Sequence, residues 1–148
     1  LEYMDSAQYF NDGNSILEEK ELVNNEKPEL NEQPLYITKY KDKYGIAWPE
    51  IVSPYQIHLI GLDLNDESVK SKVFKVYKEL EENNIEVLFD DRPAVTAGNK
   101  FSDADLIGIP VRLVVSERNA DKIEWKERTS DKSELLNLEE VLKKLKNG

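Results

Sequence analysis

Residues 85–115 read IEVLFDDRPAVTAGNKFSDADLIGIPVRLVV, and this stretch determines how the surrounding chain can fold. It begins with an apolar run, 85–89, and ends with a second apolar run, 111–115, each of which predicts a strand. Two acids and an arginine, at 90–92, follow the first strand directly. Open α/β sheets place their binding sites at the carboxyl ends of strands, so this polar group is a candidate binding site.

The segment between the two strands predicts a turn followed by a short helix. Gly98 leads a turn that carries Lys100, and residues 103–107 have the composition of one helical turn or more. Gly108 and Pro110 then end the helix, because glycine suits a left-handed cap and proline cannot continue a helix. The sequence therefore predicts a strand, a loop, a short helix and a strand.

Residues on either side of this stretch predict three more strands and two more helices. A short apolar strand begins near 57, a half-exposed strand alternates over 123–128, and a fifth strand covers 133–136. Asn65 or Asp66 caps the first helix, and Asn137 begins a capping box for the last one. The first helix has its buried stripe at helical spacing, formed by Val69, Val73, Val76, Tyr77 and Leu80.

This order of elements predicts the fold class. Strand, helix, strand, helix, strand is the pattern of right-handed βαβ units. A closing strand–strand–helix extension makes the sheet mixed. We expect an α/β fold with three layers, α/β/α, around a five-stranded mixed sheet that is mostly parallel.

The net charge of −10 is concentrated at the N-terminus. Residues 1–36 hold nine of the 30 acids and two of the 20 basic residues. With two prolines and little apolar periodicity, this acidic segment is expected to be partly disordered or irregular. Residues 37–148 are nearly balanced in charge and form the expected folded domain, in which local patches decide the partners.

The composition excludes several classes of function. The chain has no cysteine and one histidine, His58, so thiolate and histidine-rich metal sites are excluded. No glycine-rich phosphate loop and no nucleophile–base motif is present. We expect no catalytic residue, no metal and no cofactor in this chain. No apolar run is long enough to cross a membrane, and a cytoplasmic or organelle-matrix location is expected.

The motifs resemble the C-terminal anticodon-binding domain of class II aminoacyl-tRNA synthetases, and most closely that of the bacterial-type prolyl-tRNA synthetases. The resemblance extends from roughly residue 40 to the end of the chain. It rests on the segments YGIAWP (44–49), SPY (53–55), EVLFDDR (86–92), GNKF (98–101) and DADLIGIP (103–110). It implies that residues 37–148 form an anticodon-binding domain.

The resemblance implies that this domain reads the anticodon of proline tRNA, which carries two adjacent guanines. The N1–H and N2–H donors of guanine suit a carboxylate, whereas its O6 and N7 acceptors suit arginine or lysine. Unstacked loop bases also pack on aromatic rings. The expected tRNA-binding residues are Asp90, Asp91, Arg92, Lys100, Phe101 and Asp105.

The resemblance also implies partners outside this chain. Ligation of proline to tRNA, a step of protein biosynthesis, needs ATP and a class II catalytic domain in cis or in trans. Residues 1–36 lack the glycine-rich, arginine-bearing motif of such a domain. The chain alone is therefore not expected to be an enzyme, and a homodimer would form through the full enzyme.

Alternatives remain open at the level of the residues and of the function. Asp90-Asp91-Arg92 is either a structural ion pair at a strand end or a set of RNA contacts. His58 is expected to be a packed or hydrogen-bonded histidine, and Trp48 and Trp125 are expected to pack in the core. The alternative function, which the net charge of −10 favours, is a protein-interaction module that reuses the fold without binding tRNA.

Overall fold

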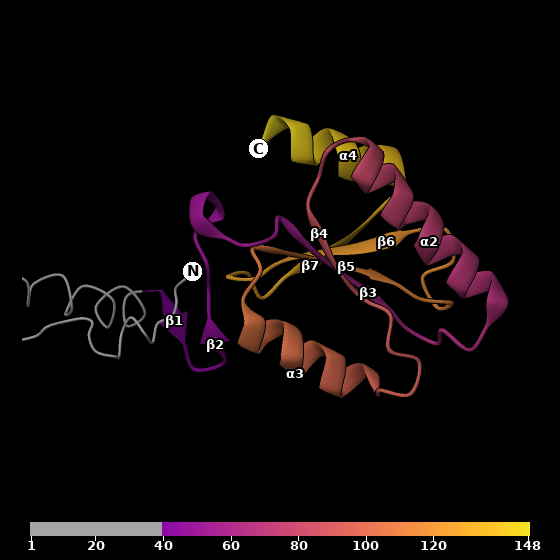
Figure 1. Cartoon of the computed structure of the whole chain (residues 1–148), viewed down its shortest axis with the longest axis horizontal. Helices are drawn as coiled ribbons and strands as arrows, with labels where there is room; N and C mark the ends of the chain where they lie inside the picture. The colour runs from indigo at the N-terminus through magenta and orange to yellow at the C-terminus, as the bar shows by residue number, and fades with distance from the viewer. Residues whose placement is uncertain (1–39) are drawn as a thin grey trace, which may run out of the picture. The chain divides into compact units, whose positions relative to one another are not determined.

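The computed structural model describes residues 40–148, and the predicted acidic segment 1–36 lies outside the described residues. The elements, in chain order, are β1 (Lys41–Asp42), β2 (Gly45–Ile46), the 3₁₀ helix η2 (Glu50–Val52), β3 (Ile57–Gly61), α2 (Glu67–Glu82), β4 (Val87–Asp90), α3 (Ala97–Ile107), β5 (Val111–Val115), β6 (Ile123–Glu127), β7 (Ser133–Leu136) and α4 (Leu138–Asn147) (Figure 1). No helix within residues 40–148 is long and apolar enough to cross a membrane.

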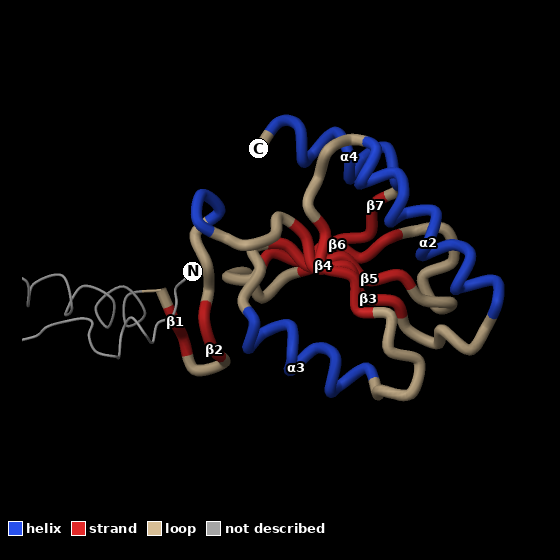
Figure 2. The backbone as a smooth tube through the Cα atoms, viewed as in Figure 1, coloured by secondary structure: helices blue, strands red, loops and turns tan. Residues whose placement is uncertain are grey.

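The main sheet has five strands in the order β4-β3-β5-β6-β7. β3 pairs in parallel with β4 and with β5, whereas β6 is antiparallel to both of its neighbours. Four of the five strands of this sheet therefore share one direction, which confirms the mixed, mostly parallel sheet. Helices α2 and α4 cover one face and α3 covers the other, so the three-layer architecture is confirmed (Figure 2).

The two faces of the sheet differ in how apolar they are. The face under α2 and α4 holds the large core, which includes Ile57, Leu59, Leu113 and Trp125. The α3 face has only a small apolar cluster, whose buried members are Ile60, Ala104 and Val114. Buried polar side chains occur on this second face, which makes it the face to examine for a binding site.

The caps predicted at the starts of two helices are confirmed. The side chain of Asp66 accepts hydrogen bonds from the backbone N–H groups of Ser68 and Val69 at 2.8 and 3.1 Å. Asn84 ends this helical segment with a left-handed φ of 62°. Asn137 caps α4 by accepting from the N–H of Glu140 at 2.9 Å. Asp66 and Asn137 thereby satisfy backbone donors that the helices themselves leave unpaired.

Helix α3 corrects one prediction. It begins at Ala97 rather than at residue 103, because the side chain of Thr96 accepts a hydrogen bond from the N–H of Asn99 at 3.2 Å and caps it there. The predicted glycine-led turn is therefore wrong, and Gly98 and Lys100 lie inside the helix. The helix ends as predicted, at Gly108, whose φ is 82°.

The β1–β2 hairpin is held against the end of α3. Arg128 donates two hydrogen bonds of 2.8 Å to the carboxylate of Asp42, and its Nε donates to the carbonyl of Asp105 at 3.0 Å. A Cβ at Gly108 would lie 1.9 Å from the carbonyl oxygen of Ile46. The close approach of these two backbones requires glycine, and it fixes the end of α3.

Candidate functional site

A pocket of about 380 Å³ lies between the edge strand β4 and helix α3. We call it the β4–α3 groove; it is lined by His58, Leu88, Phe89, Asp90, Asp91, Arg92, Asp103, Leu106 and Ile107. Its volume is at the lower end of the range found for small-ligand sites. The groove thus combines an apolar wall with a polar rim at the carboxyl end of a strand.

Arg92 is fixed on the rim by two carboxylates. Its Nε and Nη2 donate to the two oxygens of Asp90 at 2.9 and 2.7 Å, and Nη2 also donates to Asp103 at 2.9 Å. These bonds hold the pKa of Asp90 below its usual value and raise that of Arg92. The structural ion pair foreseen for Asp90 and Arg92 is confirmed. Because the side chain of Arg92 is 45% exposed, the guanidinium is both oriented and accessible.

Lys100 lies in the interior. Its side chain is 1% exposed, and its Nζ donates to the carbonyl of Gly61 at 2.7 Å and lies 3.7 Å from Asp90. Burial lowers the pKa of Lys100, and the charge of Asp90 opposes that shift. In this conformation the ammonium supports Asp90 from within the fold and offers no surface to a ligand.

The charges of the groove favour a ligand that donates hydrogen bonds. Three carboxylates, Asp90, Asp91 and Asp103, meet two cations, Arg92 and Lys100, so one negative charge is in excess. Asp91 is exposed and makes no hydrogen bond or ion pair with any residue of 40–148. Phosphate binding requires an excess of positive charge, which this groove lacks.

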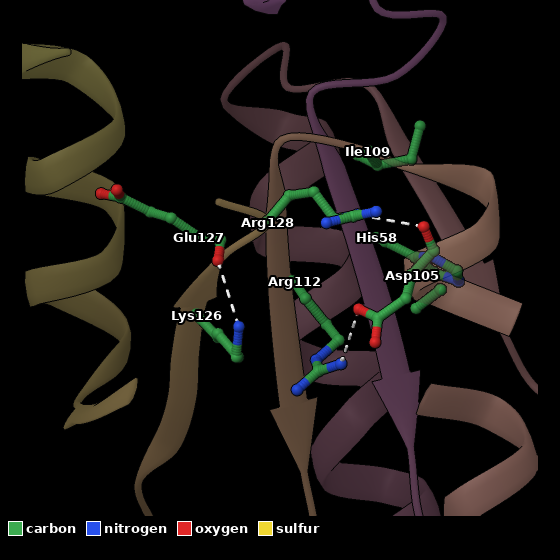
Figure 3. A pocket seen from close by; sticks show the side chains of 8 residues that line it. His58, Asp105, Ile109, Arg112, Lys126, Glu127 and Arg128 are labelled. Carbon is green, nitrogen blue, oxygen red and sulfur yellow. Dashed lines mark hydrogen bonds and ion pairs between the residues drawn. The ribbon is translucent and has the colours of Figure 1, made fainter. Parts of the chain in front are cut away.

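Phe101 and Asp105 lie away from the groove and hold Arg112. The guanidinium of Arg112 lies 4.5 Å from the centre of the Phe101 ring, and its Nη1 is 3.7 Å from Asp105. Figure 3 shows Arg112, Asp105 and Arg128 converging around a second, much smaller pocket of about 10 Å³. The structure thus brings Asp90, Asp91 and Arg92 together at the groove, but not these two residues.

Six residues of the groove are absent from the predicted site: His58, Leu88, Phe89, Asp103, Leu106 and Ile107. Asp103, Leu106 and Ile107 share one face of α3, at i, i+3 and i+4. All three residues lie within the predicted helix 103–107, but no local pattern shows that this face borders β4. Leu106 and Ile107 are 62% and 39% exposed, which is unusual for large apolar side chains next to a carboxylate rim.

His58 is a further groove residue that the predicted site does not include. It is 3% exposed, and burial lowers its pKa to about 4. The expectation that it packs in the fold is confirmed, but its Nδ1 is buried without a hydrogen-bond partner in the described structure. Strand alternation places it on the same face as Ile60, toward α3. Within residues 40–148, no group of three or more His, Asp or Glu side chains is placed to hold a metal ion.

Comparison with known proteins gives a consistent set of matches. Residues 52–148 match the family model described as "Anticodon binding domain". The proline–tRNA ligase of Dehalococcoides mccartyi (strain BAV1) is 48% identical over 111 residues, which cover 74% of this chain and 19% of that protein. The ligases of Legionella pneumophila (strain Corby) and Halothermothrix orenii are 44% and 43% identical, over 72% and 74% of this chain and 19% of each protein. The chain therefore spans about a fifth of the length of these relatives.

Proposed function

The chain belongs to the anticodon binding domain family, and from this membership we propose that it recognises the anticodon loop of proline tRNA as part of a proline–tRNA ligase. The observation that carries the proposal is the β4–α3 groove, with an unpartnered carboxylate and an oriented arginine on its rim. In this role the chain contributes recognition to translation, and it contributes none of the bond-forming chemistry.

The rim supports recognition of guanine in particular. Guanine offers two adjacent donors, N1–H and N2–H, which one carboxylate accepts together, and Asp91 is the carboxylate that is not already paired. The guanidinium of Arg92 is aligned by Asp90 and Asp103 and can donate to O6 or N7. A good bidentate contact contributes about 1–3 kcal/mol of discrimination against the wrong base.

The remaining predicted residues take supporting roles in this proposal. Asp90 and Lys100 position Arg92 from inside the fold, since both side chains are almost fully buried. Phe101 and Asp105 orient Arg112 beside the small pocket. Direct contact of Lys100, Phe101 or Asp105 with RNA stays a prediction, and the present arrangement favours Asp91 and Arg92 as the contacts.

The proposal places the other steps of ligation elsewhere in the enzyme. A class II catalytic domain, in cis or in trans, would bind ATP and proline, and a homodimer would form through that larger assembly. The relatives are about five times longer than the segment matched here, which leaves room for such a domain. We also propose a cytoplasmic location, because the tRNA that takes part in translation is found there.

Filter binding of the 148-residue chain tests the proposal. Proline tRNA is compared with the same tRNA in which the two anticodon guanines are replaced by adenines, and we expect tighter binding of the unmodified tRNA. Arg92→Ala should reduce this preference, whereas Lys143→Ala, an exposed change on α4, should affect both tRNAs equally. Equal affinity of the unchanged chain for both tRNAs would remove the claim that it recognises the anticodon.

A second candidate function is docking to another protein. Ile51 and Val52, in η2, are 92% and 48% exposed, and Tyr44 and Tyr55 nearby in the sequence are also exposed. Exposed apolar groups of this kind mark protein-interaction surfaces. If this were the main function, Ile51→Ser would abolish binding to the catalytic part of a proline–tRNA ligase, while the chain showed no affinity for tRNA.

A further inference from the structure

His58 occupies an unusual position for an ionisable residue. It lies in the central strand β3, pairs in register with Leu88 on one side and Arg112 on the other, and lines the β4–α3 groove. Its side chain is almost fully buried, and its Nδ1 is buried without a hydrogen-bond partner among residues 40–148. A buried polar group without a partner destabilises the folded state, and an apolar residue at this position would avoid that cost.

The groove distinguishes His58 from the other unpartnered buried groups. Three buried side-chain atoms in the described residues lack a partner: Nδ1 of His58, Nε of Arg112 and Nε1 of Trp125. Trp125 lies in the core under α2 and α4, and Arg112 lines the small pocket. Only His58 among the three lines the groove, so only its ring is placed to meet a ligand there.

The imidazole is neutral at physiological pH. Burial lowers its pKa to about 4, and the positive charges of Arg112 and Arg92 add to this shift, while Asp90 and Asp103 oppose it. A neutral imidazole has one N–H donor and one acceptor nitrogen. The carboxylates of the rim can only accept, and the donor on the rim, Arg92, is charged. His58 adds a neutral donor at the buried end of the groove.

Guanine has hydrogen-bonding groups that match this division. Its N1–H and N2–H donors suit a rim carboxylate, and its O6 and N7 are two acceptors, of which Arg92 can occupy one and leave the other for a second donor. Resting on the function proposed above, we infer that His58 is a specificity residue of the groove, and that its ring N–H donates to the O6/N7 edge of an anticodon guanine. An adenine has an amino donor in place of O6, so its amino group would face the ring N–H of His58, and two donors cannot form a hydrogen bond.

Modified anticodon loops test this inference without changing the protein. The 148-residue chain is titrated with a proline anticodon stem–loop in which one guanine at a time is replaced by 7-deazaguanine, which lacks N7, or by 6-thioguanine, in which a weak acceptor replaces O6. We expect at least one of these changes to weaken binding about three- to tenfold, the effect of one lost hydrogen bond. Unchanged affinity for both modified loops would overturn the inference.

Two variants assign the effect to a residue. His58→Leu should bind the modified and unmodified loops equally, whereas His58→Gln, which keeps a side-chain donor, should retain part of the difference. Asp91→Asn is the matched control. It should lose sensitivity to inosine, which lacks the 2-amino group, and keep the sensitivity to the O6 and N7 changes. If His58→Leu kept the full sensitivity, His58 would not be the donor.

The design separates failure of this inference from failure of the proposed function. A chain that prefers the proline anticodon but ignores the O6 and N7 changes retains its function and loses the role given to His58. A chain that binds all anticodon loops equally loses both. If His58→Leu does not fold, as judged by its thermal unfolding, the modified loops are compared on Arg92→Ala. Sensitivity to the O6 or N7 change that remains in Arg92→Ala supports His58 as a donor, and its complete loss would assign the contact to Arg92.

Discussion

The carboxylate of Asp90 lies close to two cationic side chains. Arg92 approaches from the rim of the groove, and Lys100 approaches from the interior, where its ammonium also binds the carbonyl of Gly61. This arrangement keeps a buried carboxylate charged, because each cation offsets part of its desolvation. Asp90 in turn aligns the guanidinium of Arg92. The buried pair of Lys100 and Asp90 therefore orients the exposed side chain of Arg92.

The first prediction concerns Lys100. Lys100→Met removes the donor to Gly61 and one of the two charges that compensate Asp90, so we expect the free energy of unfolding to fall by about 1–3 kcal/mol. Urea denaturation measures this change. Lys143→Met, an exposed change on α4, is the control and should stay within about 0.5 kcal/mol. Equal effects of the two variants would mean that the buried contacts of Lys100 contribute nothing.

The second prediction concerns His58 and pH. Its pKa is about 4 in the folded protein and near 6.5 in the unfolded chain, so the unfolded state binds more protons between these values. The contribution of His58 to stability is therefore constant above pH 6.5 and falls as the pH drops toward 4, by about 3 kcal/mol in total. Urea denaturation from pH 7 to 4 should show a smaller decrease for His58→Leu than for the unchanged chain; parallel curves would contradict the shift.

The sequence predicts the identity of the rim residues better than their surroundings. Asp90, Asp91 and Arg92 follow an apolar strand directly, and their position at its carboxyl end is a local property. The burial of Lys100 depends on a partner 39 residues earlier in the chain, Gly61, which no local pattern reveals. Lysine is also rarely buried completely, so its type favours an exposed position.

At the scale of elements, the strands and two of the three longer helices follow from apolar periodicity and caps. The sequence pattern predicts helix α3 only from residue 103, because Gly98 favours a turn. In the structure Gly98 lies in the first helical turn after the Thr96 cap. The groove does not follow from the sequence for a different reason: its helical wall, Asp103, Leu106 and Ile107, borders β4 only through the packing of α3 on the sheet.

The third prediction compares the two glycines at opposite ends of α3. Gly108→Ala would place a Cβ 1.9 Å from the carbonyl oxygen of Ile46 at a φ of 82°, so we expect a loss of about 2 kcal/mol or more and displacement of the β1–β2 hairpin. Gly98→Ala meets nothing within 4 Å and should stabilise the chain by up to about 1 kcal/mol. Thermal unfolding measures both, and a similar melting temperature for the two variants would contradict the close approach of the hairpin.

At the scale of the whole molecule, the two faces of the sheet have separate tasks. The α2–α4 face contains the main apolar core, and the α3 face holds the charged network and the groove. The order of strands and helices predicted these layers. It did not predict which face carries the polar groups, because that depends on how Lys100, Arg112 and Asp90 pack across the sheet.

The fourth prediction concerns salt. The groove has an excess of negative charge and the whole chain carries −10, so few phosphates can be neutralised in the complex. With at most about two phosphate contacts, the logarithm of the affinity should fall with the logarithm of the salt concentration with a slope of about −1.5 or shallower. The slope is measured by titrations at salt concentrations from about 50 to about 200 mM. A slope steeper than about −4 would indicate a phosphate-binding surface instead.

The most direct measurement follows the backbone amide resonances of the isotope-labelled chain while the proline anticodon stem–loop is added. Residues 88–92 and 103–107, which form the rim and wall of the β4–α3 groove, should shift, and residues 138–147 of α4, on the opposite face, should not. Shifts confined to α4, or none at the groove when the RNA is bound, would contradict recognition of the anticodon at this site.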